Sequence, residues 1–387
     1  ARKTGKARNS KPIVNERETM QQQYKILRWL SAIAVAFALV VIMLGAWVRL
    51  SDAGLGCPDW PACYGHITWP SQADDIERAT TNYPERPVEV HKAWKEVIHR
   101  YFAGALGLIV LALAWLNWRL RKHYRDLPLR LSLLLLVVIC VQAAFGMWTV
   151  TLQLLPWVVT THLLGGMTTA ALLFWQARRV RAAQPVAGVQ EPAQTGAQAL
   201  RADNEDHGDK HYRVSHHGSV PQLRPWVLAG LLVLVVQIAL GGWVSSNYAA
   251  LACIDLPTCQ QQWWPDTNFA EGFKIAREIG IDYEGGVLDQ AARNAIHISH
   301  RIGALVAFVI IAGMSLMLLR YPITRFAGAL VGLLLLVQIT LGINNIVLLL
   351  PLWNAVAHNG VAALLLLAVV NALWRTRKVT SINPAAA

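Results

Sequence analysis

The chain has 387 residues, of which 55% are hydrophobic and only 15% are Asp, Glu, Lys or Arg. Soluble domains carry about a quarter charged residues, so this composition excludes an ordinary soluble protein and indicates a polytopic membrane protein. The net charge of +12 does not indicate a nucleic-acid partner, because the Lys and Arg residues lie in short segments beside apolar runs, where they orient membrane helices. We therefore expect the lipid bilayer as a partner and no nucleic acid.

The chain begins with a basic, polar segment that has no hydrophobic periodicity. We expect residues 1–28 to form a disordered cytoplasmic tail. The first apolar run, near 29–50, is longer than the ~7 to 15 residues of a signal-peptide core and lacks a small-residue cleavage site. It predicts a transmembrane helix that is retained.

Eight apolar runs are long enough to cross the hydrocarbon layer, which takes about 20 helical residues. They lie near 29–50, 97–118, 129–150, 158–177, 225–246, 296–319, 324–347 and 354–374. When these spans are threaded in order, the basic segments fall on one side, which the positive-inside rule makes the cytoplasm. Both termini are then cytoplasmic, and the cysteine-containing loops at 51–96 and 247–295 lie on the periplasmic side. The predicted fold class is an all-α integral membrane protein of the inner (cytoplasmic) membrane.

The second half of the chain repeats the pattern of the first. The matching elements are Cys57 and Cys63 with Cys253 and Cys259, His99-Arg100 with His300-Arg301, and Val141-Gln142 with Val337-Gln338. Because each half has four spans, the repeats share one orientation in the membrane. We expect two pseudo-symmetric four-helix bundles, at 29–177 and 225–374. A flexible cytoplasmic linker at 178–224 joins them, and a cytoplasmic tail follows at 375–387.

Four histidines lie near the outer end of even-numbered spans: His99, His162, His300 and His358. A helix rises ~1.5 Å per residue, so all four are expected at one depth in the outer leaflet. Small residues follow each histidine by three to five positions and leave room for a flat macrocycle, and heme iron accepts axial histidines from facing helices. The pattern predicts two bis-histidine heme sites; the alternative is hydrogen bonding between helices. His297 competes for the role of His300, which the matching His-Arg pair favours.

The two halves differ beside the histidines. Glu96 lies three residues before His99 on the same helix face, whereas His297 holds the matching position in the second half. A carboxylate next to a heme suits proton transfer or the stabilisation of positive charge. The alternative is an interfacial ion pair with Arg100 or Lys95. The asymmetry predicts that the first half is catalytic and that the second half carries electrons.

Arg49 also has no charged counterpart, because Ser245 fills the matching position. A guanidinium group can hold a heme propionate through two parallel hydrogen bonds. The alternative is that Arg49 extends to the membrane interface to keep its charge in water.

The four outer-loop cysteines form two pairs, Cys57 with Cys63 and Cys253 with Cys259. Disulfides persist outside the cytoplasm, so we expect two of them. The competing hypothesis is a metal site of four thiolates, although the spacing is not the usual one for zinc.

The segment GAWVRLSDAGLGCPDWPACYG, the motif EVIHR, the two-half architecture and the four histidines resemble the heme A synthase family, in its bacterial type with two cysteine pairs. The similarity spans Trp29 to Trp374. It implies an enzyme, a membrane oxidoreductase that oxidises the C8 methyl group of heme O to the formyl group of heme A for terminal oxidases.

The resemblance also implies roles for the predicted site residues. Histidines 99 and 162 would hold the substrate heme, histidines 300 and 358 a heme b cofactor, and Glu96 would take part in the chemistry. Heme O is the implied substrate and heme A the product. Heme O synthase and a membrane electron acceptor are expected partners, and a homo-oligomer is compatible with the sequence. The alternative function is that of a bis-histidine di-heme cytochrome in quinol-linked electron transfer, which would not need Glu96 in one half only.

Overall fold

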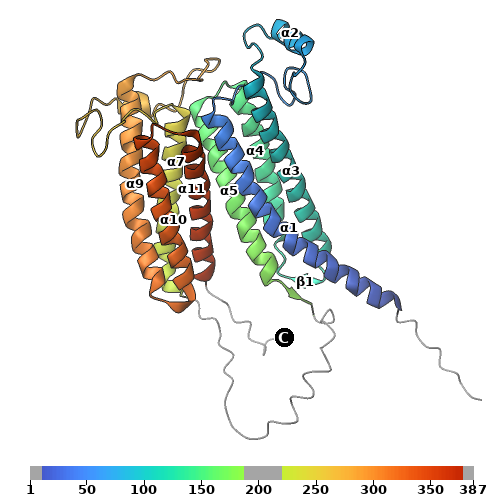
Figure 1. The fold of residues 1–387 in the computed structure, drawn as a ribbon. Helices are drawn as coiled ribbons and strands as arrows, with labels where there is room; N and C mark the ends of the chain where they lie inside the picture. The colour runs from blue at the N-terminus through green and yellow to red at the C-terminus, as the bar shows by residue number, and fades with distance from the viewer. Residues whose placement is uncertain (1–10, 187–219, 378–387) are drawn as a thin grey trace, which may run out of the picture.

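The computed structural model describes residues 11–186 and 220–377, with side chains from residue 18 onward. Within these ranges it is almost entirely helical, and eight helices are long and apolar enough to cross a membrane (Figure 1). They are α1 (Lys11–Leu50), α3 (Val90–Leu120), α4 (Leu129–Thr151), α5 (Pro156–Ala182), α7 (Arg224–Ser246), α9 (Gln290–Leu319), α10 (Pro322–Val347) and α11 (Leu352–Arg375). The expected all-α, multi-pass membrane protein is confirmed.

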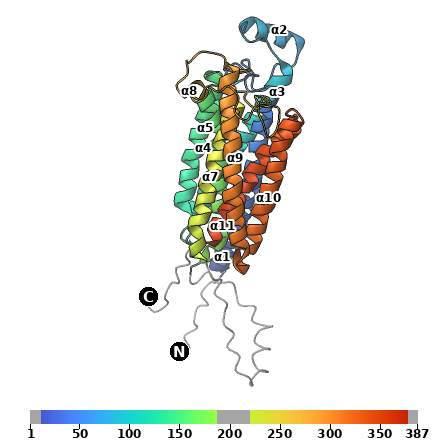
Figure 2. The same cartoon turned by 90° about the vertical axis from the view of Figure 1, so that its left-hand side faces the viewer.

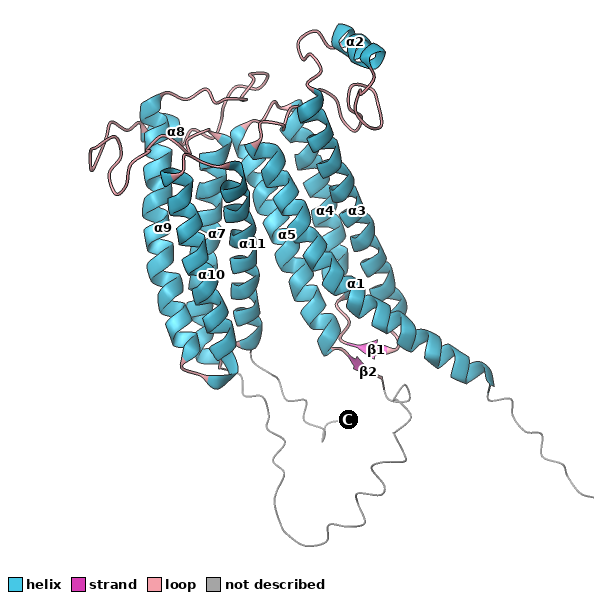
Figure 3. Cartoon of the chain, in the orientation of Figure 1, coloured by secondary structure: helices cyan, strands magenta, loops and turns pink. Residues whose placement is uncertain are grey.

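Five short elements complete the described chain. They are α2 (Ala73–Asn82), α8 (Phe269–Gly272), the 3-10 helix η1 (Pro221–Leu223), β1 (Tyr124–Arg125) and β2 (Gln184–Pro185). The two strands pair antiparallel at the lower end of the first half, and Figure 3 shows how small this sheet is beside the helices. The helices α2 and α8 lie at the upper end, in the loops that carry the cysteines (Figures 2 and 3).

Each half packs its long helices in a ring of the same order. In the first half α1 and α4 each contact α3 and α5, and in the second half α7 and α10 each contact α9 and α11. The halves meet through α5 and α11, with α1 against α11 and α5 against α7. Two parallel repeats require this neighbour order; the pseudo-symmetry itself stays a prediction.

Helix starts follow the local sequence. Proline in the first turn begins α5, α7 and α10, where its missing N–H needs no partner. At α9 the carboxylate of Asp289 accepts a hydrogen bond from the backbone N–H of Ala292 at 2.7 Å and caps the helix. These starts fix the register of the spans relative to the upper and lower ends.

The first helix begins earlier than the sequence predicts. It starts at Lys11, so residues 11–28 are helical, and the expectation of disorder for this stretch is wrong. Tyr24 holds this part of α1 against α5 and β1: its hydroxyl donates to the carbonyl of Val180 at 2.8 Å, and its ring stacks on that of Tyr124 with centroids 4.0 Å apart. The rest of the predicted tail lies outside the described residues.

The expected linker is only partly described. Its first residues continue α5 to Ala182 and then form β2, which pairs with β1, and its last residues form η1 and the start of α7. The predictions of a flexible linker over 187–219 and of a tail over 378–387 lie outside the residues that the structure describes.

The second outer loop crosses from its own half to the first half. We call residues 281–286 the strap. Tyr283, 3% exposed, is buried in a cluster with Leu55, Leu154 and Val158 of the first half. Its backbone N–H donates to the carbonyl of Gln153 at 3.1 Å. The sequence gives no sign of this crossing, because nothing in the loop marks Tyr283 as a core residue.

Ion pairs flank Tyr283 on both sides. Arg86 contacts Asp282 at 2.6 Å and Glu284 at 3.1 Å, and Lys92 contacts Glu284 at 3.0 Å. The side chains of Arg86, Lys92 and Glu284 are 18–23% exposed, so solvent screens them less than a surface pair. The strap is therefore held to the first half by one buried ring and a charge network.

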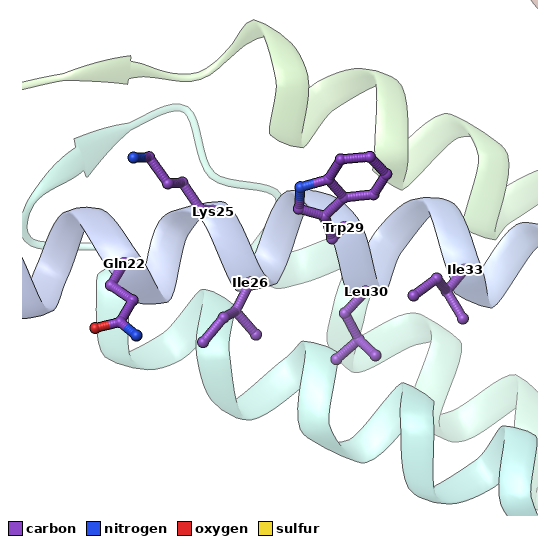
Figure 4. A pocket seen from close by; sticks show the side chains of 6 residues that line it. All are labelled: Gln22, Lys25, Ile26, Trp29, Leu30 and Ile33. Carbon is purple, nitrogen blue, oxygen red and sulfur yellow. The ribbon is translucent and has the colours of Figure 1, made fainter.

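A shallow groove marks the outward face of α1 near its lower end (Figure 4). It is lined by Gln22, Lys25, Ile26, Trp29, Leu30 and Ile33. Trp29 is 73% exposed, as expected of an aromatic side chain at a membrane boundary. The groove contains none of the predicted site residues.

We expect Glu284→Gln to weaken the strap, because both Arg86 and Lys92 lose their shared carboxylate. The apparent Tm of the purified protein should fall by roughly 2 to 6 °C, since a partly buried ion pair contributes about 1 to 2 kcal/mol. The matched control is Arg78→Gln, which removes the pair with Asp75 from a side chain that is 74% exposed and should leave the Tm unchanged. Equal shifts in the two variants would contradict a strap held by charge.

Candidate functional site

The predicted histidines of the first half each face a glycine on the preceding long helix. A Cβ atom built on Gly45 of α1 would lie 2.9 Å from Cε1 of His99 on α3. One built on Gly146 of α4 would lie 3.3 Å from Cε1 of His162 on α5. Both distances are closer than ordinary van der Waals contact, so each imidazole occupies the space that glycine leaves free.

The second half has the same arrangement. A Cβ on Gly241 of α7 would lie 3.2 Å from Cε1 of His300 on α9, and one on Gly342 of α10 would lie 3.2 Å from Cε1 of His358 on α11. The four histidines therefore lie between helices, each in a space provided by the glycine of a neighbour.

The small residues that follow the histidines on their own helices have varied surroundings. The sequence assigned the open space to small residues that follow each histidine on its own helix, such as Gly104 after His99. Gly104 has no other atom within 4 Å of a built Cβ and shares the outward face of α3 with Leu108 and Leu111, which are 69% and 55% exposed. The glycines that face the imidazoles belong to the neighbouring helices, and the space for a macrocycle beside the histidines stays a prediction.

The structure brings the four histidines together as two pairs. His99 lies within electrostatic interaction range of His162, and His300 within range of His358. Each pair belongs to one half and joins two helices of that half. This is the pairing that the repeat predicted.

Polar partners differ between the pairs. In the second half Gln237 Nε2 lies 3.1 Å from Nδ1 of His300, and Gln338 Nε2 lies 3.1 Å from Nε2 of His358. In the first half the position matching Gln237 is Val41, and Gln142 Nε2 donates to the backbone carbonyl of His162 at 2.5 Å rather than to its ring. The sequence marked Gln142 and Gln338 only as matching positions of the repeat and did not predict their contacts with the histidines, and it gave no signal for Gln237.

In the first half Nδ1 of His99 and Nδ1 of His162 are buried and have no hydrogen-bond partner. A buried polar atom without a partner costs free energy, so these rings lack a group that a ligand can supply. Two facing imidazoles per site fit heme iron, which takes its other four ligands from the macrocycle. The residues of the first half therefore fit a heme, and the second half supplies the same pair of histidines, with glutamine amides beside their ring nitrogens.

Glu96 connects α3 to the first disulfide loop. It is 4% exposed; Oε1 accepts from Arg100 at 2.5 Å, and Oε2 accepts from the backbone N–H of Cys57 at 2.9 Å. Arg100 also donates to the carbonyls of Asp59 and Ala62. The ion pair between Glu96 and Arg100, which the sequence offered as the alternative, is present. A role of Glu96 in the reaction stays a prediction.

His297 holds the same place in the second half. Its Nδ1 lies 3.4 Å from the backbone nitrogen of Cys253 and accepts its hydrogen bond. Arg301 donates to the carbonyls of Cys253, Asp255 and Thr258. In both His-Arg pairs, His99-Arg100 and His300-Arg301, the histidine faces the neighbouring helix and the arginine binds carbonyl groups of the cysteine loop. His297 contacts that loop, which favours His300 as the residue facing His358.

Both predicted disulfides are present, Cys57–Cys63 and Cys253–Cys259. All four cysteines are at most 3% exposed. These bonds exclude the alternative in which the thiolates share a metal ion.

An aspartate organises the inside of each disulfide loop. Asp59 accepts from the backbone N–H groups of Tyr64 and Gly65 at 2.6 and 2.8 Å. In the second loop, hydrogen bonds from the Thr258 hydroxyl and from the backbone N–H of Gln261 lower the pKa of Asp255 to about 2. Asp255 is therefore ionised at every physiological pH, and the loop keeps its shape.

Arg49 joins the two halves. Its Nη2 donates to the carbonyl of Ser245 at 2.5 Å, and its guanidinium lies 4.2 Å from the ring centroid of Tyr248. Nη1 is 3.7 Å from Asp52, while Nε is buried without a partner. The structure thus shows a contact between halves that the sequence did not predict, and Nε is the atom still free for a propionate.

The fold and the paired histidines define a polytopic membrane protein with a candidate bis-histidine site in each half. The chain belongs to the cytochrome oxidase assembly protein family, whose model matches residues 28–370. This confirms the resemblance seen in the sequence.

Individual relatives agree with the family match. A heme A synthase of Shewanella oneidensis is 44% identical over 364 residues, which cover 92% of this chain and 99% of that protein. A heme A synthase of Sphingopyxis alaskensis is 26% identical over 92% of this chain and 94% of its own length. One of Mesorhizobium japonicum is 28% identical over 95% of both.

We expect Gly45→Ala to displace the imidazole of His99, because the added methyl group would lie 2.9 Å from Cε1. If His99 binds heme as the sequence predicts, the heme content of the purified protein should fall by about half, with the second-half site retained. Gly104→Ala on α3 is the matched control and should keep full content, because its methyl group meets no other atom. Full heme content in both variants would show that Gly45 does not set the position of His99.

Proposed function

We propose that this protein is a heme A synthase, an enzyme that oxidises the C8 methyl group of heme O to the formyl group of heme A. The carrying observation is the pair of facing imidazoles in each half, each ring seated against a glycine. A relative that is 44% identical over 92% of the chain and is named heme A synthase supports the same activity.

The proposal divides the two sites. His99 and His162 hold the substrate heme, and His300 and His358 hold heme b. The asymmetry around the pairs supports this division, because the second-half rings have glutamine partners whereas the first-half rings have an unpartnered Nδ1. Hydrogen bonds that fix the orientation of the ligating rings favour tight binding of a resident cofactor. A substrate that must leave is released more easily from rings without such partners.

The overall chemistry requires an electron path. Conversion of a methyl to a formyl group removes four electrons and four protons and takes one oxygen atom from water. Heme b, a one-electron carrier, would supply the path toward an electron acceptor in the membrane if His300 and His358 hold it. The two candidate sites lie in adjacent bundles that meet through α5 and α11.

Glu96 is proposed to act on the charge and protons of this reaction. It lies one turn before His99 on α3 and is buried, so its charge acts at short range through a medium of low dielectric constant. Its hydrogen bonds to Arg100 and Cys57 also fix its position. A carboxylate held in this way stabilises positive charge that develops nearby without having to reorganise.

The unpartnered Nε of Arg49 supports the proposed propionate contact. Arg49 would then bind a propionate of the first-half heme while it holds Ser245 of the second half. The substrate site would thereby be coupled to the contact between the two halves.

The proposed setting is the inner (cytoplasmic) membrane, with both termini cytoplasmic and the cysteine loops periplasmic. Support comes from the clustering of basic residues at the lower ends of the helices and of disulfides at the upper end. The bundles at 29–177 and 225–374 serve as the substrate and heme b domains. Heme O synthase is the expected source of the substrate, and association into homo-oligomers belongs to the same proposal.

Co-expression with a source of heme O, followed by extraction and identification of total heme, tests the activity. The wild-type chain should produce heme A. Glu96→Gln should retain bound heme but lower heme A by at least about a hundredfold, the range typical of a group that acts on protons or charge in the reaction. Heme binding without any heme A from the wild-type chain would instead support the di-heme cytochrome.

His297→Gln provides the matched control for Glu96→Gln. It alters the corresponding contact with the cysteine loop in the second half and should leave heme A production near that of the wild type. If Glu96→Gln loses heme, or if both variants lose product equally, the residues at these positions only hold their loops.

A further inference from the structure

Five arginines gather at the lower end of the contact between the halves. We call Arg178, Arg179 and Arg181 of α5 together with Arg375 and Arg377 at the end of α11 the inter-half arginine cluster. Arg178 is within electrostatic range of Arg181, Arg375 and Arg377, and Arg377 is within range of Arg179. Burial and the neighbouring Arg179 lower the pKa of Arg377.

None of the five arginines takes part in an ion pair within the described part of the chain. All the salt bridges found there involve residues of α1, α2, α3 or the outer loops at the upper end. The acidic side chains described at the lower end are those of Glu18 in α1 and Asp126 in the turn after β1. Neither is among the charges that act on Arg178 or Arg377. The cluster therefore concentrates positive charge without a described counterion.

Aromatic rings hold the guanidinium groups at a defined depth. Arg377 lies 3.3 Å and Arg178 5.5 Å from the ring centroid of Trp374, which packs edge-on against Trp175 at 5.0 Å. Arg375 donates to the carbonyl of Ile323 at 3.1 Å, and its Nε is buried without a partner. The cluster is thus anchored where the apolar spans of α5 and α11 end.

We propose that the inter-half arginine cluster binds the phosphate headgroup of an anionic phospholipid, whose acyl chains lie along the joined ends of α5 and α11. Guanidinium groups bind phosphate oxygens in pairs, and basic sites between membrane helices bind lipids that carry two phosphates. Five guanidinium groups from both halves suit such a lipid. The bound lipid would neutralise their mutual repulsion and hold the halves together at the end opposite to the strap.

A lipid headgroup suits the cluster better than a soluble anion because the cluster lies at the level of the membrane surface. The arginines lie at the last turns of membrane-spanning helices, next to a tryptophan pair, where headgroups are the anions present at high local concentration. Inorganic phosphate offers the same oxygens but no apolar chains. The two sources can therefore be separated by experiment.

The test titrates the detergent-purified full-length protein with cardiolipin, with phosphatidylcholine and with inorganic phosphate. We would measure the apparent Tm, and we would identify retained lipid by native mass spectrometry. Cardiolipin should raise the Tm of the wild type and remain bound, and phosphatidylcholine should do neither. Arg178→Gln/Arg377→Gln should weaken cardiolipin binding by at least about tenfold, because each basic residue near the surface contributes about 1 kcal/mol.

Arg119→Gln/Arg121→Gln is the matched control, because these residues end α3 at the same boundary and lie over Trp115 and Trp118 in the same way. It should leave cardiolipin binding unchanged. If the first double variant does not purify, Arg179→Gln/Arg181→Gln, both exposed, should weaken binding in the same direction. Equal loss in the control, equal shifts with phosphatidylcholine, or a full shift with inorganic phosphate would each overturn the proposal. None of these outcomes depends on heme A production.

Discussion

The close approach of an imidazole to a neighbouring helix is the contact on which the rest of the site depends. All four histidines meet a glycine on the facing helix, at a distance where a Cβ atom would lie within 2.9 to 3.3 Å of Cε1 of the ring. The ring then lies at the contact between the two helices. Packing against a glycine places the candidate ligands in both halves, and glutamine contacts add to it in the second half.

The same scaffold carries two different environments. In each half an arginine next to the histidine holds the disulfide loop, so the loops are structural counterparts. The halves differ one turn before the histidine, where Glu96 in the first half corresponds to His297 in the second. They also differ beside the rings, which contact glutamine side chains only in the second half. The strap and Arg49 then join the halves at the upper end. The repeated fold thus gives its two candidate sites different surroundings, which is what the proposed division into a cofactor site and a substrate site needs.

Much of this could be predicted from the sequence. The number of spans, the cysteine pairs and the four histidines can be predicted from apolar runs and repeated motifs, because each of these signals lies within a short stretch of the chain. The helical start of α1, the burial of Tyr283 and the contact of Arg49 with Ser245 do not, because each depends on a surface far away in the chain. Two of the facing glycines could have been noted from the sequence, since the motifs GAWV and GGWV place Gly45 and Gly241 at matching positions of the repeat. Only the structure shows that they face the imidazoles.

The most direct test is the identity of the heme that each half retains. Protein purified from cells that make heme O should be compared as His99→Ala/His162→Ala and as His300→Ala/His358→Ala, with heme extracted and identified by mass. The account predicts that the first variant retains heme b and lacks heme O and heme A, and that the second loses heme b. Loss of the same heme in both variants would contradict the division into a substrate site and a cofactor site.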